Sequence, residues 1–143
     1  MSAPDVAQKQ TILIVDDAPD NIMLLSALLK SRYRLKIATN GVKALELART
    51  APRPELILLD VMMPEMDGLE TCRRLKANAE TADIPVIFLT ARIQPEDEAR
   101  GLQLGAADYI TKPISPPVVL ACVATQLGFR KASCNPGTSN PNA

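Results

Sequence analysis

Leu56-Ile57-Leu58-Leu59-Asp60, four apolar residues that end in one carboxylate, is the stretch that decides the fold. Three other strand-like runs also end on polar residues: residues 12–15 before Asp16-Asp17, residues 86–89 before Thr90, and residues 107–111 before Lys112-Pro113. Continuous apolar runs of this length are typical of parallel strands that are buried on both faces. Because parallel strands end at the same edge of a sheet, these runs predict one edge that gathers carboxylates, a hydroxyl and an ammonium group.

Strand-like and helix-like segments alternate outward from these runs. The expected strands cover about residues 11–16, 35–39, 55–60, 85–90 and 108–111, and a helix follows each of them, the last at about 116–129. Asn40 and Asp67 are typical helix N-caps. Five such βα units predict an α/β flavodoxin-like (βα)5 fold, a doubly wound parallel five-stranded sheet in the order 2-1-3-4-5. In that order strands one and three are neighbours, so Asp16, Asp17 and Asp60 are expected to meet.

The composition bounds the class of protein. The 143 residues carry a formal charge of +0 and fit one domain, which we expect at 11–129, between a disordered tail at 1–10 and a flexible tail or linker at 130–143. There is no basic surplus for nucleic acid or an anionic membrane, no apolar stretch long enough for a bilayer, and no signal-peptide core. Three scattered cysteines favour a reducing, cytoplasmic setting.

The chemistry available at the predicted edge is narrow. The chain has no histidine, which excludes Ser-His-Asp and Cys-His catalysis and histidine metal sites. Three crowded carboxylates repel one another, and Mg²⁺, which prefers oxygen ligands, relieves that repulsion better than calcium or a soft metal. Lys112 then either neutralises the cluster or holds an incoming phosphoryl oxygen. For phosphoryl transfer, the best nucleophile left is a carboxylate, and Asp60 stands alone at the end of its strand.

Four motifs in this order resemble those of the receiver domain of two-component response regulators, the CheY-like domains. They are IVDD at residues 14–17, DVMMPEMDG at 60–68, LTA at 89–91 and DYITKP at 108–113. The resemblance covers about residues 11–129. It implies that a sensor histidine kinase or phosphotransfer protein passes a phosphoryl group from phosphohistidine to Asp60, with Mg²⁺ as cofactor.

The resemblance also implies the roles of the other site residues. Asp17 and Asp60 would bind Mg²⁺ directly, Asp16 mainly through water, and the Met62 backbone carbonyl would complete the protein ligands. The groups expected to hold the phosphoryl oxygens are the Thr90 hydroxyl, the Ala91 backbone N–H and the Lys112 ammonium, next to a cis Lys112–Pro113 peptide. Thr90 and Tyr109 match the family's switch pair, which would bias a surface made of the fourth helix, the fifth strand and the fifth helix. Met62 and Arg92 occupy the positions that tune phosphoryl lifetime, and neither would align a hydrolytic water, so we expect a long-lived phosphoryl-aspartate.

Two other function classes compete with this signalling switch, which would not be an enzyme in its own right. A Mg²⁺-dependent aspartyl phosphatase usually needs a second carboxylate two residues after the nucleophile, and that position is Met62. A pseudo-receiver, which binds without being phosphorylated, is disfavoured by the presence of Asp60, Thr90 and Lys112.

The last expected helix carries no charge from Ser115 to Phe129. We expect five of its residues to cover the sheet: Val118, Val119, Cys122, Val123 and Leu127. Its outward face is predicted to contact a downstream output domain, a partner, or a second copy in a weak or phosphorylation-dependent dimer.

Overall fold

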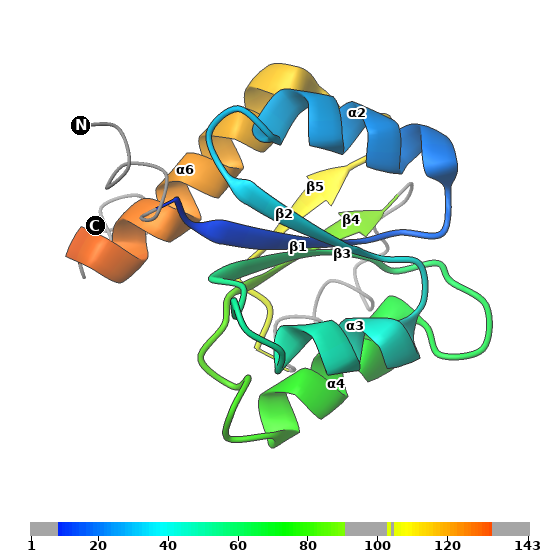
Figure 1. Ribbon diagram of the computed structural model, residues 1–143. Coiled ribbons are helices and arrows are strands. Elements are labelled where there is room, and N and C mark those ends of the chain that lie inside the picture. The colour runs from blue at the N-terminus through cyan, green and yellow to red at the C-terminus, as the bar shows by residue number, and fades with distance from the viewer. Residues whose placement is uncertain (1–8, 91–102, 104, 133–143) are drawn as a thin grey trace.

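The computed structural model describes residues 9–90, 103 and 105–132, together with the side chains of these residues up to Gly128 (Figure 1). The fourth expected helix, after residue 90, lies outside the described residues. Five parallel strands form one sheet in the order β2-β1-β3-β4-β5, which confirms the predicted topology. The strands are β1 (Thr11–Val15), β2 (Arg34–Ala38), β3 (Leu56–Asp60), β4 (Val86–Thr90) and β5 (Asp108–Thr111).

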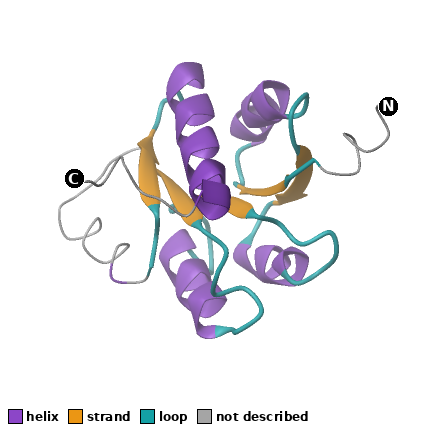
Figure 2. Cartoon of the chain, turned by 90° about the vertical axis from the view of Figure 1, so that its left-hand side faces the viewer, coloured by secondary structure: helices purple, strands orange, loops and turns teal. Residues whose placement is uncertain are grey.

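Helices cover both faces of this sheet (Figures 1 and 2). They are α2 (Pro19–Leu29), α3 (Gly41–Ala48), α4 (Gly68–Ala77) and α6 (Pro116–Ala132). Side chains alternate across the strands, so Ile12 and Ile14 of β1 pack with α2 and α6, while Leu13 and Val15 pack with α3 and α4. The three central strands are buried on both faces, as their continuous apolar runs predict.

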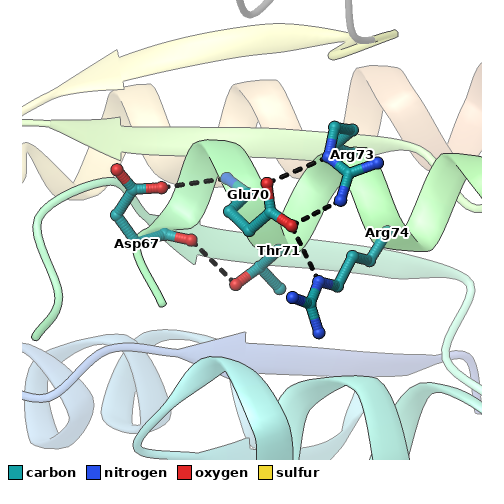
Figure 3. Close-up of polar contacts among 5 residues, drawn as sticks. All are labelled: Asp67, Glu70, Thr71, Arg73 and Arg74. Atoms are coloured by element: carbon teal, nitrogen blue, oxygen red, sulfur yellow. Dashed lines mark hydrogen bonds and ion pairs between the residues drawn. The ribbon is translucent and has the colours of Figure 1, made fainter. Parts of the chain in front are cut away.

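The two predicted N-caps are present. The Asn40 Oδ1 atom accepts a hydrogen bond of 2.8 Å from the Lys43 backbone N–H at the start of α3. The Asp67 Oδ1 atom accepts one of 2.9 Å from the Glu70 backbone N–H at the start of α4 (Figure 3). Each cap satisfies one of the backbone donors that the first helical turn leaves unpaired, so both helices begin where the sequence indicates.

Two expectations for α6 are wrong in detail. The helix continues to Ala132 instead of ending at Phe129. Val118 is 47% exposed and does not cover the sheet, whereas Val119, Val123 and Leu127 are buried. Consecutive helical residues point about 100° apart, so Val118 and Val119 cannot both face inward. Within the described part of the chain, no helix has the length and apolarity that crossing a membrane requires.

Candidate functional site

The predicted polar residues meet at the carboxyl edge of the sheet. Asp60 is the last residue of β3 and Thr90 the last of β4, while Asp16 and Lys112 follow β1 and β5 directly. In the sheet register, Val15 lies opposite Leu59 and Asp60 opposite Leu89, which aligns the strand ends. The order β1-β3-β4-β5 therefore brings together groups that are up to 96 residues apart in the chain.

Three carboxylates form the centre of the site. One carboxylate oxygen from each of Asp16, Asp17 and Asp60 lies within 4.8 Å of the others. Asp16 and Asp60 are buried, whereas Asp17 is exposed. The Asp16 Oδ1 atom accepts a hydrogen bond of 2.9 Å from the Ala18 backbone N–H, which fixes that side chain. The cluster therefore has a rigid buried side and one member that faces solvent.

Lys112 supplies the positive charge that such a cluster needs. Its Nζ atom lies 3.2 Å from Asp16 Oδ2 and 3.2 Å from Asp60 Oδ1, and its side chain is 17% exposed. Its backbone N–H donates to the Thr90 carbonyl at 2.7 Å, and the Lys112–Pro113 peptide is cis, as expected. Buried carboxylates without a partner are costly, so Lys112 is the main compensating charge among the described side chains.

The Asp60 carboxyl has a pKa raised to about 6. Burial is the largest cause, since it disfavours the charged form, and repulsion from Asp16 adds to it. The Lys112 ammonium and the Met62 backbone N–H, 3.3 Å from Asp60 Oδ1, act in the opposite direction. Near neutral pH the carboxylate form is therefore available, but it is less stable than that of an ordinary aspartate.

This shift predicts a pH-dependent effect of Asp60→Asn on stability without metal. The folded Asp60 pKa, about 6, lies above the ordinary 3.8, so the stability linked to this group is fully present below about pH 4 and is lost as the pH rises through 6. Asparagine resembles the neutral form, so the variant should be more stable than wild type at about pH 8, by about 2 kcal/mol. Near pH 4 this advantage should vanish. Urea unfolding of both proteins in EDTA at the two pH values measures the difference in their free energies of unfolding. The same difference at both pH values would contradict the account.

Gly68 shapes the loop after Asp60, and this role was not predicted from the sequence. A Cβ atom on Gly68 would collide with the Asp60 carbonyl oxygen and lie 2.8 Å from Val61 Cα. The Gly68 backbone N–H donates to the Val61 carbonyl at 2.9 Å, which closes the loop onto its own start. The Asp-Gly pair at 67–68 was the available signal, because glycine often marks a close backbone approach.

Gly68→Ala is expected to destabilise the protein by about 1–3 kcal/mol, a typical cost of overpacking. The added methyl group forces the Asp60–Val61 backbone to move, so the phosphoryl acceptance expected of Asp60 from the sequence should fall as well. Thermal unfolding and adduct formation measure the two effects. Gly128→Ala is the matched control, since a Cβ there meets no atom within 4 Å. Equal behaviour of the two variants would show that the close approach has no consequence.

The donor set fits a magnesium ion. It is made of carboxylate oxygens only, and Mg²⁺ binds through a few such oxygens while keeping several waters. Asp17 is the most accessible member, and Asp16 and Asp60 share their remaining oxygens with Lys112. Met62 is 72% exposed, while Met63 is buried.

The switch and lifetime residues are placed only in part. Thr90 is buried beside the cluster, and the half-buried Tyr109 packs against Phe88 with ring centroids 5.6 Å apart. Ala91 and Arg92 lie outside the described residues, and the switch, phosphoryl-binding and lifetime roles of all these residues stay predictions.

The comparisons with known proteins agree with this geometry. The family model for the response regulator receiver domain matches residues 12–124. The chain is 50% identical over 132 residues, 92% of its length, to a protein of Vibrio cholerae named "Probable cyclic di-GMP phosphodiesterase", and covers 30% of that protein. It is 42% identical over 120 residues, 83% of its length, to the response regulator PleD of Caulobacter vibrioides, and covers 26% of that protein. The chain thus spans less than a third of these two relatives.

A solved structure is similar in the same region. The receiver domain of the sensor histidine kinase PA1611 from Pseudomonas aeruginosa has a TM-score of 0.76 and 31% identity, over 84% of this chain and 98% of that one. That structure holds a magnesium ion coordinated in its active site cleft.

Proposed function

This chain belongs to the response regulator receiver domain family of two-component systems, which are signalling switches, and from this premise we propose that Asp60 is its phosphoacceptor. The observation that carries the proposal is the position of the Asp60 carboxylate. It ends β3, lies 3.2 Å from the Lys112 ammonium, and shares an edge of the sheet with two further carboxylates. The donor would be the phosphohistidine of a sensor histidine kinase or of a phosphotransfer protein.

The hydrogen bonds support one of the two Asp60 carboxylate oxygens as the attacking atom. The Asp60 Oδ1 atom accepts from both Lys112 and the Met62 backbone N–H, and among the described residues no donor reaches Oδ2. We assign Oδ2 as the nucleophile: it forms the new P–O bond while the P–N bond of phosphohistidine breaks and the imidazole nitrogen leaves with that electron pair. Both Asp16 oxygens are already engaged, by Ala18 and Lys112, which disfavours Asp16 as the acceptor.

The remaining groups balance charge around the acyl phosphate. Lys112 would hold one phosphoryl oxygen after it exchanges its contact with Asp60, and the Thr90 hydroxyl and Ala91 backbone N–H would hold the others. When held by Asp17, Asp60 and the Met62 carbonyl, and by Asp16 through water, Mg²⁺ would neutralise the negative charge that accumulates there. The proposed readout is a movement of Thr90 and Tyr109. This movement would change the surface made of the helix expected after residue 90, β5 and α6.

We place this switch in the cytoplasm, with no activity beyond accepting and slowly losing the phosphoryl group. Its downstream partner would be an output domain or protein that binds the surface made of the helix expected after residue 90, β5 and α6. The phosphodiesterase name of the Vibrio cholerae relative belongs to a protein of which this chain covers 30%.

The phosphoryl group is expected to be long-lived. The Met62 side chain is exposed beside Asp60, and a thioether cannot activate water as a general base. The half-life of the adduct with Mg²⁺ should therefore be minutes or longer, as followed by intact mass after the phosphodonor is removed. Met62→Glu offers the comparison, because it adds a carboxylate at that position. A half-life of only seconds for the wild type would contradict this expectation.

One experiment separates this proposal from its rivals. The protein is incubated with Mg²⁺ and acetyl phosphate, and both its intact mass and the release of inorganic phosphate are followed. A receiver gains one phosphoryl group. Rapid turnover without an adduct would indicate the aspartyl phosphatase, and neither adduct nor turnover would indicate a pseudo-receiver.

A further inference from the structure

A small hollow lies between α3 and α4. These two helices cover the side of the sheet opposite to α2 and α6 (Figure 1). Its volume is about 150 Å³, and it is lined by Leu45, Arg49, Arg74, Leu75, Asn78 and Thr81. We propose that this hollow is a docking site for a partner protein, and that it takes one acidic side chain flanked by apolar residues.

The two arginines offer unused hydrogen-bond donors. Arg49 is exposed and makes no ion pair with any described residue. Arg74 is held by one bond of 2.8 Å from its Nε atom to Glu70 Oε2, while its Nη atoms donate to none of the described groups (Figure 3). A guanidinium fixed at one nitrogen keeps a preorganised fork for a carboxylate. No carboxylate lines the hollow itself. Glu70, outside it, pairs with the Arg74 Nε atom, and the Arg49 charge has no such partner among the described residues.

Helix capping does not account for Arg49. Cations near the end of a helix often bind its last carbonyls, which is the ordinary role for an arginine in this position. In this protein Lys36 has that role: its Nζ atom donates to the carbonyls of Leu47 at 2.7 Å and Thr50 at 2.6 Å. The Arg49 guanidinium is therefore available to bind an anion.

The charge of this face favours an acidic partner. The two segments that line the hollow, Gly41–Arg49 and Gly68–Thr81, together carry five basic and three acidic side chains, whereas the whole chain has 16 of each sign. Surfaces of one sign steer partners of the opposite sign and discriminate among them. The basic excess is local to α3 and α4. It therefore predicts a preference for acidic partners, which the neutral total charge of the chain does not reveal.

The size of the hollow favours a side chain over a small molecule. Pockets for drug-sized ligands measure about 300–1,000 Å³, and this hollow has about 150 Å³. Leu45 and Leu75 supply apolar atoms beside the arginines, which suits an anchor with a charged end and apolar neighbours. Arg49 and Asn78 are the C-caps of α3 and α4, at the helix ends away from the Asp60 edge. Docking there leaves the phosphoacceptor accessible.

The test is an NMR titration of the full 143-residue protein. The probe is the peptide acetyl-Leu-Glu-Leu-amide, and its matched control is acetyl-Leu-Gln-Leu-amide. The glutamate peptide should shift the side-chain resonances of Arg49, Arg74, Leu45 and Leu75 in a saturable way, with a dissociation constant of about 1 mM. Arg49→Gln and Arg74→Gln should each weaken binding about tenfold. Arg73→Gln removes the neighbouring charge outside the hollow and should bind as wild type.

Any of the following outcomes would overturn the proposal. The first is no saturable shift at tens of millimolar peptide, and the second is that the glutamine peptide binds as tightly as the glutamate peptide. The third is that Arg73→Gln weakens binding as much as Arg49→Gln and Arg74→Gln do. The fourth is that inorganic phosphate causes the same shifts, which would indicate a site for small anions. Shifts of these resonances with protein concentration alone would assign the hollow to a second copy instead. Adduct formation with acetyl phosphate should stay intact in all three variants, which separates this proposal from that for Asp60.

Discussion

Asp60→Ala is expected to abolish the phosphoryl adduct that wild type forms with acetyl phosphate and Mg²⁺. The substitution removes the proposed nucleophile, and neither neighbouring carboxylate replaces it well. Asp16 has both oxygens engaged, and Asp17 is exposed on the rim of the cluster. Intact mass measures the result, with no increase in the variant under conditions that convert wild type fully.

The matched control is Asp108→Ala, which removes an exposed carboxylate from β5 outside the cluster. It should gain one phosphoryl group as wild type does. Because Asp60→Ala also relieves the burial of a charge, the variant should stay folded, and thermal unfolding checks this. An adduct of undiminished yield in Asp60→Ala would move the acceptor to another residue and contradict the assignment.

Lys112→Gln is the change with the second-largest expected effect. Its ammonium contacts both Asp16 and Asp60 at 3.2 Å, and it is the group best placed to neutralise a phosphoryl oxygen. Removal of one such stabilising group typically slows chemistry about 10²–10³-fold, which is the loss expected for adduct formation. The rate of mass increase under excess acetyl phosphate measures it.

The same substitution should destabilise the metal-free protein. Breaking a buried charge pair costs about 3–5 kcal/mol, because the partner charges stay buried. The loss of stability should shrink when Mg²⁺ is added, since the cation restores the missing positive charge. Lys112→Met is a second variant without charge and should behave alike. A rate within about twofold of wild type in either variant would show that Lys112 has only a structural role.

The strand-edge pattern predicted the central site because its cause is topological. Parallel strands end at one edge, so Asp16, Asp60 and Lys112 had to meet once the strand order was right. Repulsion among the carboxylates was expected from the sequence, whereas the structure shows that burial is the larger cause of the raised Asp60 pKa. Burial depends on how loops and helices close over the strand ends, which the strand pattern does not contain.

Features that depend on packing between distant segments were not predicted. The close approach of Gly68 to the Asp60 backbone requires the path of the intervening loop. The hollow between α3 and α4 forms where the two helices pack together. This packing brings Arg49 and Arg74, which are far apart in sequence, to the same hollow. The exposure of Val118 follows from helix rotation, which a list of apolar positions left ambiguous.

Chemical trapping of the adduct tests the central claim most directly. Borohydride reduces an aspartyl phosphate to homoserine, so the modified position is read from peptide masses after digestion. The account predicts that wild type, treated with acetyl phosphate and Mg²⁺ and then reduced, contains homoserine at position 60 and at no other aspartate. Homoserine at position 16 or 17, or a phosphoryl group that resists reduction because it is on a hydroxyl, would contradict it.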